Sequence, residues 1–424
     1  MARAPLPTLD PSRDAAALLR RLGFVVLMLG VPLAALLARR GVVMLVPIGV
    51  SLLVVASLLD GQIRPVRQVL MRLAGSLAAV AIAVGLVWVA LSLLWAPRPA
   101  GGLERLLSVM ATLGVAFAGY LALPDRMRSA NLYLIPVGAA LAAGTAILLA
   151  VISGGASEFD EDGQSVGRGL AVIALFAWPS IAWLRSRERD LEAFTLAVLI
   201  ATATVVVGGR TPLPIALAAG ALAYAISSLW PKGGASATGA IMALVVLAAP
   251  VLSFLPLPVL TRPVGSSMWG EGMQAWRAVI ASDPLRLVTG HGFSALVRDR
   301  LAGLLPPGTP NSALFQIWYD LGLVGAIAGA ATLWSGPRGA VASYAPLLPG
   351  IIATFATAFT MAAFGIGTSQ MWWLTAITLV VLAFVAAQRG QFRTSRPRAL
   401  LFGATRDGAA VRARSTSPAG NHRR

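Results

Sequence analysis

The chain has 424 residues, of which 57% are hydrophobic and only 12% are charged. Soluble domains carry about twice that charged fraction, so the composition excludes an ordinary soluble fold. The absence of cysteine also excludes disulfides and thiol chemistry.

Apolar segments follow one another along the chain and predict membrane-spanning helices, because a helix needs about 20 apolar residues to cross a bilayer. The twelve predicted segments are residues 22–38, 41–59, 73–95, 106–123, 131–152, 170–184, 193–208, 212–229, 238–255, 313–333, 345–366 and 371–387. The fold class predicted from them is all-α, a polytopic membrane helical bundle of about 12 transmembrane helices with one large periplasmic loop.

The predicted organisation has five parts. They are a cytoplasmic N-terminal segment (1–21), a first part of the bundle (22–255), the large periplasmic loop (256–312), a last part of the bundle (313–387) and a basic, disordered cytoplasmic tail (388–424). The first apolar stretch is interpreted as the first span, because no cleavage site and soluble domain follow it.

The net charge of +17 is explained by membrane orientation. With the N-terminus inside, 23 of the 34 Lys and Arg residues fall on the cytoplasmic side, which is the positive-inside pattern. The basic tail would contact anionic headgroups. We therefore predict membrane lipids, and not nucleic acid, as partners.

Two predicted outward connections before the long loop carry charged residues. Residues 153–168 contain the acidic run from Glu158 to Asp162, whose spacing matches no EF-hand, so a solvated loop is favoured. The same connection ends at Arg168, and residues 208–211 hold Arg210, each arginine beside glycines. Arginine near the hydrocarbon edge is costly unless it reaches headgroups or an anion. Two readings follow: interfacial anchors, or ligands for the diphosphate of a lipid-linked substrate.

The long loop contains several local signals. Glu271 to Ile280 has an apolar face at helical spacing, which predicts an amphipathic helix that Asp283-Pro284 stops. A glycine-punctuated turn surrounds His291. Thr309-Pro310 predicts a helix N-cap followed by proline at the first helical position.

An acid inside a predicted span and three tryptophans are further candidates for function. Asp320 is predicted to lie over two turns inside its span, facing neighbouring helices, and an acid inside a membrane is a functional candidate. Trp269, Trp276 and Trp318 either stack on sugars or mark the membrane interface, and the interface reading is the safer one.

Several segments, in this order, resemble the O-antigen ligase and polymerase family of bacterial membrane proteins. The segments are Leu91–Pro97, Arg168–Leu170, Ala177–Pro179, Gly209–Pro212, Asp283-Pro284, Gly290–Phe293, Gln316–Gly325 and Trp372–Leu374. The resemblance covers roughly residues 80 to 385. It implies a helical bundle with a large periplasmic loop and polyprenyl-diphosphate-linked glycans as substrates. It also favours Arg168 and Arg210 as the arginines that hold the diphosphate.

The sequence departs from this family at the expected catalytic position. Where the family carries His-Pro-His-Asn, this chain has Thr309-Pro310-Asn311-Ser312, so Asn311 replaces the second histidine. The family's loop arginine is also missing, with Trp269 near its place. Asparagine cannot act as a general base, although it can orient a hydroxyl group.

One other histidine could supply a base on the outer side. His422 falls in the tail, so His291 is the remaining candidate, against the alternative of a solvated loop histidine. We therefore predict Asn311 and His291 as catalytic candidates, with no metal and no cofactor. Glu271, Asp283, Asp299 and Asp320 are further carboxylates without an assigned role.

Three functions remain open from the sequence. The first is a glycan ligase or polymerase of the bacterial inner membrane, which would transfer sugar from polyprenyl diphosphate to a lipid or sugar acceptor in surface polysaccharide assembly, such as that of lipopolysaccharide. The second is a non-catalytic homologue that binds lipid-linked glycan. The third is a transporter, which would need polar residues at mid-span and two similar halves. The glycan and the acceptor are not encoded in any motif.

Overall fold

The computed structural model describes residues 11–38, 40–61, 63–152, 163–209, 211–252, 254, 266–306, 308–366 and 370–390. The side chains of residues 163–165, 252 and 266–271 are outside this description. The described residues from 11 to 390 belong to one compact unit, and residues 391–424 lie outside the described part of the chain.

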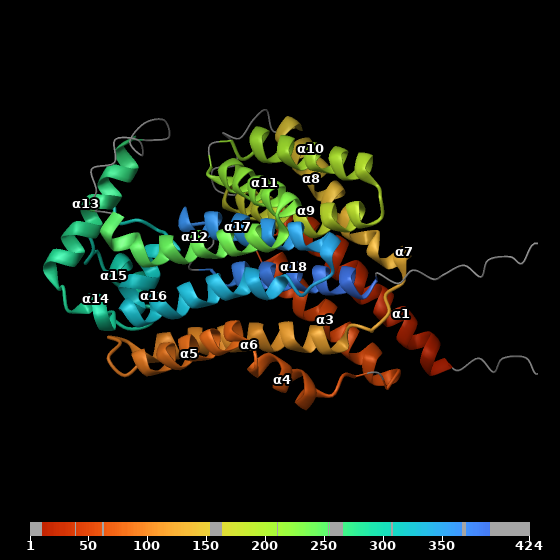
Figure 1. Ribbon diagram of the computed structural model, residues 1–424, viewed down its shortest axis with the longest axis horizontal. Helices are drawn as coiled ribbons and strands as arrows, with labels where there is room; N and C mark the ends of the chain where they lie inside the picture. Colours follow the sequence, from red (N-terminus) through yellow and green to blue (C-terminus); the bar gives the residue numbers. More distant parts are fainter. Residues whose placement is uncertain are drawn as a thin grey trace, which may run out of the picture. The chain divides into compact units, whose positions relative to one another are not determined.

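All regular structure in the described residues is helical (Figure 1). The first half contains α1 (Pro11–Val25), a π-helical turn (Val26–Gly30), α2 (Val31–Leu37), α3 (Gly41–Leu59), α4 (Val66–Ala74), α5 (Leu77–Ser92), α6 (Pro99–Ala122), α7 (Ser129–Leu132), α8 (Leu134–Ile152) and α9 (Gly163–Ser186). The second half contains α10 (Asp190–Val206), α11 (Leu213–Leu229), α12 (Pro231–Leu252), α13 (Ser266–Ser282), α14 (Arg286–Thr289), α15 (Ala295–Leu301), α16 (Ala313–Ala340), a short 3-10 turn (Ala345–Leu347), α17 (Leu348–Ala363) and α18 (Met371–Arg389).

The helices indicate a multi-pass membrane protein. Each of the twelve predicted segments falls on helix, and in the described part of the chain nine helices are long and apolar enough to cross a membrane. A tenth crossing results if α4 and α5, which meet at a bend of 90°, count as one broken span. The predicted number of twelve is not confirmed, because α10 and α11 have only 17 residues each.

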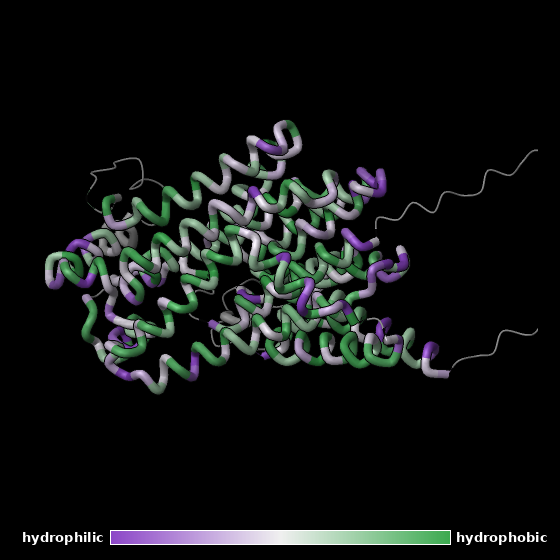
Figure 2. Tube along the Cα trace, turned by 60° about the horizontal axis from the view of Figure 1, so that its bottom comes forward, coloured by the Kyte–Doolittle hydropathy of each residue, from purple (hydrophilic) through white to green (hydrophobic). Residues whose placement is uncertain are grey.

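Polar residues gather at the two ends of this helical unit. The hydropathy tube is hydrophobic along most of the helices and hydrophilic mainly at their ends and connections (Figure 2). The end that carries α13, α14 and α15 is called the loop end below, and the end where α1 begins and α18 finishes is called the tail end (Figure 1).

Helix α9 forms the core of the bundle. It packs against α2, α8, α10, α17 and α18, and its side chains from Leu170 to Trp183 are almost all buried. A helix that is apolar on every side needs neighbours on every side. Small residues permit this close packing: a Cβ on Gly350 of α17 would lie 2.6 Å from Ala182 Cβ of α9.

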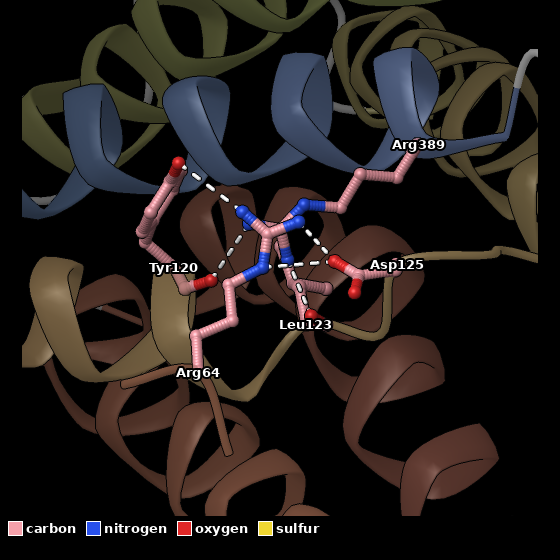
Figure 3. Close-up of polar contacts among 5 residues, drawn as sticks. All are labelled: Arg64, Tyr120, Leu123, Asp125 and Arg389. Carbon is pink, nitrogen blue, oxygen red and sulfur yellow. Dashed lines mark hydrogen bonds and ion pairs between the residues drawn. The ribbon is translucent and has the colours of Figure 1, made fainter. Parts of the chain in front are cut away.

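At the tail end, a cluster of polar side chains connects the last residue of α18, the end of α6 and the segment before α4 (Figure 3). The Arg389 guanidinium donates to the carbonyl oxygens of Leu123 and Tyr120, at the end of α6, and lies over the Tyr120 ring. Arg64, just before α4, pairs with Asp125 and donates to Tyr120 Oη. Hydrogen bonding from Arg64 lowers the pKa of the exposed Asp125 carboxyl.

The two arginines of this cluster are expected to differ in their contribution to stability. Arg389 is only 8% exposed, so Arg389→Gln leaves helix-terminal carbonyl oxygens without donors and should destabilise the fold by about 2–3 kcal/mol. Arg64→Gln removes a pair whose Asp125 side chain is 73% exposed, so its cost should stay below about 1 kcal/mol. Thermal unfolding in detergent compares the two variants, and equal losses would contradict this assignment.

The start of α16 corrects one sequence prediction. Ser312, not Thr309, is the N-cap: its hydroxyl oxygen accepts from Phe315 N at 3.1 Å, and the helix begins at Ala313. Thr309 instead donates its hydroxyl to Pro306 O at 2.6 Å. Proline at 310 therefore belongs to the connection, and the capping serine stands three residues after the predicted cap.

Two of the predicted tryptophans, Trp276 of α13 and Trp318 of α16, are buried in the core. Trp276 and Trp318 are 8% and 7% exposed. Trp276 packs edge-on against Phe315, and Trp318 Nε1 donates to Val246 O of α12 at 2.8 Å. Trp276 thus holds α13 against α16, and Trp318 holds α16 against α12, so both rings are engaged within the bundle and do not fit sugar stacking. The interface prediction stays untested. The Trp269 side chain lies outside the described residues.

Candidate functional site at the loop end

A break in α16 organises the loop end. Gly322 has φ 63° and ψ −155°, a conformation that interrupts the helix and removes its local backbone hydrogen bonds. Donors from elsewhere satisfy three carbonyl oxygens just before the break. His291 N donates to Tyr319 O at 2.8 Å, Gly292 N to Asp320 O at 3.0 Å, and Trp88 Nε1 to Leu321 O at 2.9 Å.

Glycine is required on both sides of this junction. Gly290 has φ +72°, and a Cβ there would lie 2.3 Å from Asp320 O. A Cβ on Gly322 would lie 2.5 Å from Val288 O. The Gly290–Gly292 turn predicted from sequence is therefore the segment that docks onto the broken helix.

Asp320 holds the start of α15 in place. Its Oδ1 accepts from Leu296 N at 2.8 Å, and its Oδ2 accepts from Ser294 N at 3.2 Å and from Gln316 Nε2 at 3.4 Å. The side chain is 1% exposed. The prediction that Asp320 is buried inside its span is confirmed, but its backbone partners come from the loop and not from neighbouring membrane helices.

A second buried acid is paired in the same region. Tyr319 Oη donates to Asp299 Oδ2 at 2.8 Å, while Arg298 Nε donates to Asp299 Oδ1 at 2.6 Å. Asp299 is 4% exposed. Both carboxylates, Asp299 and Asp320, thus have partners that fix α15 against α16.

His291 lies flat on Tyr319. The ring centroids are 4.0 Å apart with an interplanar angle of 5°, and His291 Nδ1 is 3.1 Å from Tyr319 O. A carbonyl oxygen only accepts, so Nδ1 carries the hydrogen and the neutral ring keeps a lone pair on Nε2. Burial lowers the pKa of His291 from its ordinary value, and this keeps the ring neutral at pH 7.

Asn311 is held by an arginine of α15. Arg300 Nη1 donates to Asn311 Oδ1 at 2.8 Å, and Arg300 Nη2 donates to Pro310 O at 3.0 Å and to Thr309 O at 3.1 Å. Gly365, after α17, also lies close to Asn311, since a Cβ on Gly365 would lie 2.1 Å from Asn311 O. This arginine therefore fixes the segment in which the family resemblance places a catalytic histidine.

A cavity of about 610 Å³ opens where α15 meets the connection between α5 and α6. Its walls are formed by Ala96, Pro97, Arg98, Gly101, Gly102, Phe293, Ser294, Ala295, Val297, Arg298, Leu301, Ala302 and Leu304. A third cation lies beside it: Arg105 Nη1 donates to Ser294 Oγ at 3.3 Å, and its guanidinium lies 5.8 Å from the centroid of the Phe293 ring. Two arginines, Arg98 and Arg298, thus lie in the cavity wall, and a third contacts Ser294 of that wall.

The predicted site residues are not brought together at this cavity. His291 lines a separate cavity of about 20 Å³ with Trp276, Arg286 and Tyr319. Asn311 and the half-buried Arg168 line neither cavity. Arg210 and the acidic run Glu158–Asp162 lie outside the described residues, as does the Glu271 side chain.

The glycine after Arg168 has a packing role. A Cβ on Gly169 would lie 2.5 Å from a side-chain carbon of Leu36, so this glycine lets α2 approach α9 closely.

In the part of the chain that the structure describes, no three His, Cys, Asp or Glu side chains gather closely enough to hold a metal ion.

Sequence reasoning missed Arg98, Arg105 and Arg298. Arg98 and Arg105 are seven residues apart, which is about two helical turns and places them on one face of a helix starting at Pro99. That spacing is the available signal. Nothing in the sequence pairs this face with α15, which follows almost 200 residues later.

Comparison with known proteins gives no match: no family model fits the chain, and no curated protein or solved structure is similar to it. The family resemblance therefore rests on the residues quoted in the sequence analysis.

Proposed function

We propose that the protein is a membrane glycosyltransferase of the O-antigen ligase or polymerase kind, acting on polyprenyl-diphosphate-linked glycans in surface polysaccharide assembly. The observation that carries this proposal is the cavity of about 610 Å³ with Arg98 and Arg298 in its wall and Arg105 beside it. Guanidinium groups match phosphate oxygens bidentately, and several together offset the charge of a diphosphate.

The position of the cavity suits an amphiphilic substrate. Its wall begins at Ala96, four residues after α5 ends at Ser92. On α6, which begins at this cavity, the side chains of Leu103, Leu107 and Met110 are apolar and exposed. A lipid-linked diphosphate would thus have its charged group at the arginines and its chain in the hydrocarbon region beside the bundle.

The proposed chemistry is transfer at the anomeric carbon. The acceptor hydroxyl oxygen bonds to that carbon, the bond from the carbon to the diphosphate oxygen breaks, and the hydroxyl proton passes to a base or to water. Fixed cations stabilise the negative charge that develops on the leaving diphosphate. His291 stays the candidate base because its Nε2 keeps a lone pair. Arg168 and Arg210 are an alternative place for the diphosphate, proposed from the sequence alone, because Arg168 does not line this cavity and Arg210 lies outside the described residues.

In the proposed topology both termini are cytoplasmic and the protein lies in the bacterial inner membrane. The loop end would then face the periplasm, where lipid-linked glycans are joined to their acceptors.

A non-catalytic homologue that binds the same glycan is the second candidate. Asn311 cannot take a proton at neutral pH, and its side-chain oxygen already accepts from Arg300. Among the described residues of the cavity wall, none is a histidine or a carboxylate. These two observations favour binding without a protein base.

Deletion of the gene followed by gel analysis of surface polysaccharide tests the proposal. We expect the deletion to lose polymer or its attachment, and the wild-type gene to restore it. The double variant Arg98→Gln/Arg298→Gln should fail to restore it, whereas Arg277→Gln, which removes an exposed charge on α13 outside the cavity wall, should succeed.

Two further variants separate the candidate functions. His291→Ala and Asn311→Ala should each lower polymer formation if these residues take part in transfer, and normal polymer with both would assign them no catalytic role. Unchanged surface glycan in the deletion strain would overturn the transferase and the glycan-binding proposals together.

A further inference from the structure

Helix α4 stands apart from the rest of the bundle. It meets α5 at 90° and lies at the lower edge of the view in Figure 1. Successive residues of a helix turn by about 100°, so Val66, Val69, Leu70 and Leu73 share one face, and Arg67 and Arg72 flank it on either side. Of these apolar residues Val69 alone is buried. A helix of this kind lies in the interface of a bilayer.

The cluster in Figure 3 holds the start of α4 near the tail end of the bundle. Arg64, two residues before the helix, is held by Asp125 and Tyr120 at the tail end. If α5 crosses the membrane, a helix at right angles to it runs along the membrane surface. In that arrangement the two exposed side chains, Arg67 and Arg72, would meet lipid headgroups.

An apolar groove of about 440 Å³ starts beside α4 and follows α5. Its lining runs from Ala74 and Ala79 through Ala83 and Val87 to Leu91, with Val324 of α16 on the other side. The hydrogen bond from Trp88 Nε1 to Leu321 O keeps α5 on α16 along this groove.

We propose that α4, α5 and α16 form a binding site for an anionic phospholipid of the surrounding membrane. The phosphate lies between Arg67 and Arg72, and one acyl chain fills the groove along α5. The basic residues beside an apolar channel match a molecule with a negative head and an apolar chain, and they lie away from the residues that line the loop-end cavity.

Native mass spectrometry of the full-length protein tests this site. The protein is released from vesicles of equal amounts of phosphatidylglycerol and phosphatidylcholine, and the retained lipids are counted. We expect phosphatidylglycerol to be retained in preference, and Arg67→Gln/Arg72→Gln to lower that preference about tenfold or more. Arg67→Lys/Arg72→Lys, which keeps the charge, should retain most of it.

The groove is tested by a second variant. Ala83 is exposed and lines the groove, so Ala83→Trp fills it without altering the core and should reduce retention of both lipids. Leu222→Trp, at an exposed position on α11, and Lys232→Gln, at an exposed basic residue, are the matched controls and should leave retention unchanged.

Three results would overturn the proposal. They are a preference that survives Arg67→Gln/Arg72→Gln, an equal loss in Lys232→Gln, and displacement of the retained phosphatidylglycerol by added polyprenyl diphosphate. The last result would assign the groove to the substrate instead. Because lipid retention requires no transfer activity, it is measured independently of the proposed function.

Discussion

Gly290→Ala is expected to detach the loop from α16 and to destabilise the protein more than any other single exchange of glycine for alanine in α14, α15 and their connections. The new Cβ would lie 2.3 Å from Asp320 O, and the backbone has φ +72°, which L side chains rarely adopt. The hydrogen bonds from His291 N and Gly292 N to α16 would be lost together. Thermal unfolding in detergent and limited trypsin digestion at Arg286 and Arg298 measure the effect.

Gly303→Ala separates the steric clash from backbone strain. Gly303 has φ +67°, but no atom lies within 4 Å of its Cβ position, so its substitution should cost only about 1–2 kcal/mol. We expect Gly290→Ala to cost clearly more and to expose the loop to trypsin. Equal stability and equal digestion of the two variants would show that the loop does not depend on its contact with α16.

Asp320→Ala is expected to have the second largest effect. It leaves the buried amides of Ser294 and Leu296 without an acceptor, at about 1–3 kcal/mol for each group. The start of α15 would lose its anchor, and with it the position of Arg298 in the cavity wall. We therefore expect a lower unfolding temperature together with weaker substrate binding.

Two comparison variants test this role of Asp320. Asp320→Asn keeps one oxygen that can accept from Leu296 N, so it should lose less stability than the alanine variant. Asp283→Ala removes an acid whose side chain is 48% exposed and whose partner Arg286 is 3.5 Å away, so it should be nearly neutral. If Asp283→Ala destabilises as much as Asp320→Ala, the anchoring role is wrong.

The helices follow closely from the sequence because apolar length is a local property. The predicted segment 41–59 coincides with α3, and the stop at Asp283-Pro284 coincides with the end of α13 at Ser282. The number of crossings could not be derived in the same way. Whether residues 66–92 cross once or not at all depends on the bend between α4 and α5, and hydropathy does not record such a bend.

The site could be predicted only in part, because it depends on contacts between distant segments. The turn around His291 was predicted from its glycines, whereas its docking onto the break at Gly322 depends on a φ that the sequence does not display. Likewise, the sequence leaves Trp276 and Trp318 open to sugar stacking or to a place at the membrane interface. Their burial depends on distant partners, Phe315 of α16 for Trp276 and Val246 of α12 for Trp318.

The arginines also show that local sequence is a poor guide to which residues meet in the fold. Arg168 and Arg210 were selected because glycines flank them, yet Gly169 serves the packing of α2 on α9. Arg98 and Arg298 carry no such local mark and come together only because α15 folds back on the connection between α5 and α6. The prediction for Arg210 stays untested, since this residue lies outside the described part of the chain.

The most direct test of the loop-end cavity is equilibrium binding of polyprenyl diphosphate to the purified protein in nanodiscs. We predict that Arg98→Gln/Arg298→Gln weakens binding at least about tenfold, which corresponds to the loss of about 1.4 kcal/mol, while Arg277→Gln binds like the wild type. Polyprenyl monophosphate, with fewer phosphate oxygens, should bind the wild type more weakly. Unchanged affinity of the double variant for polyprenyl diphosphate would contradict the assignment of this cavity.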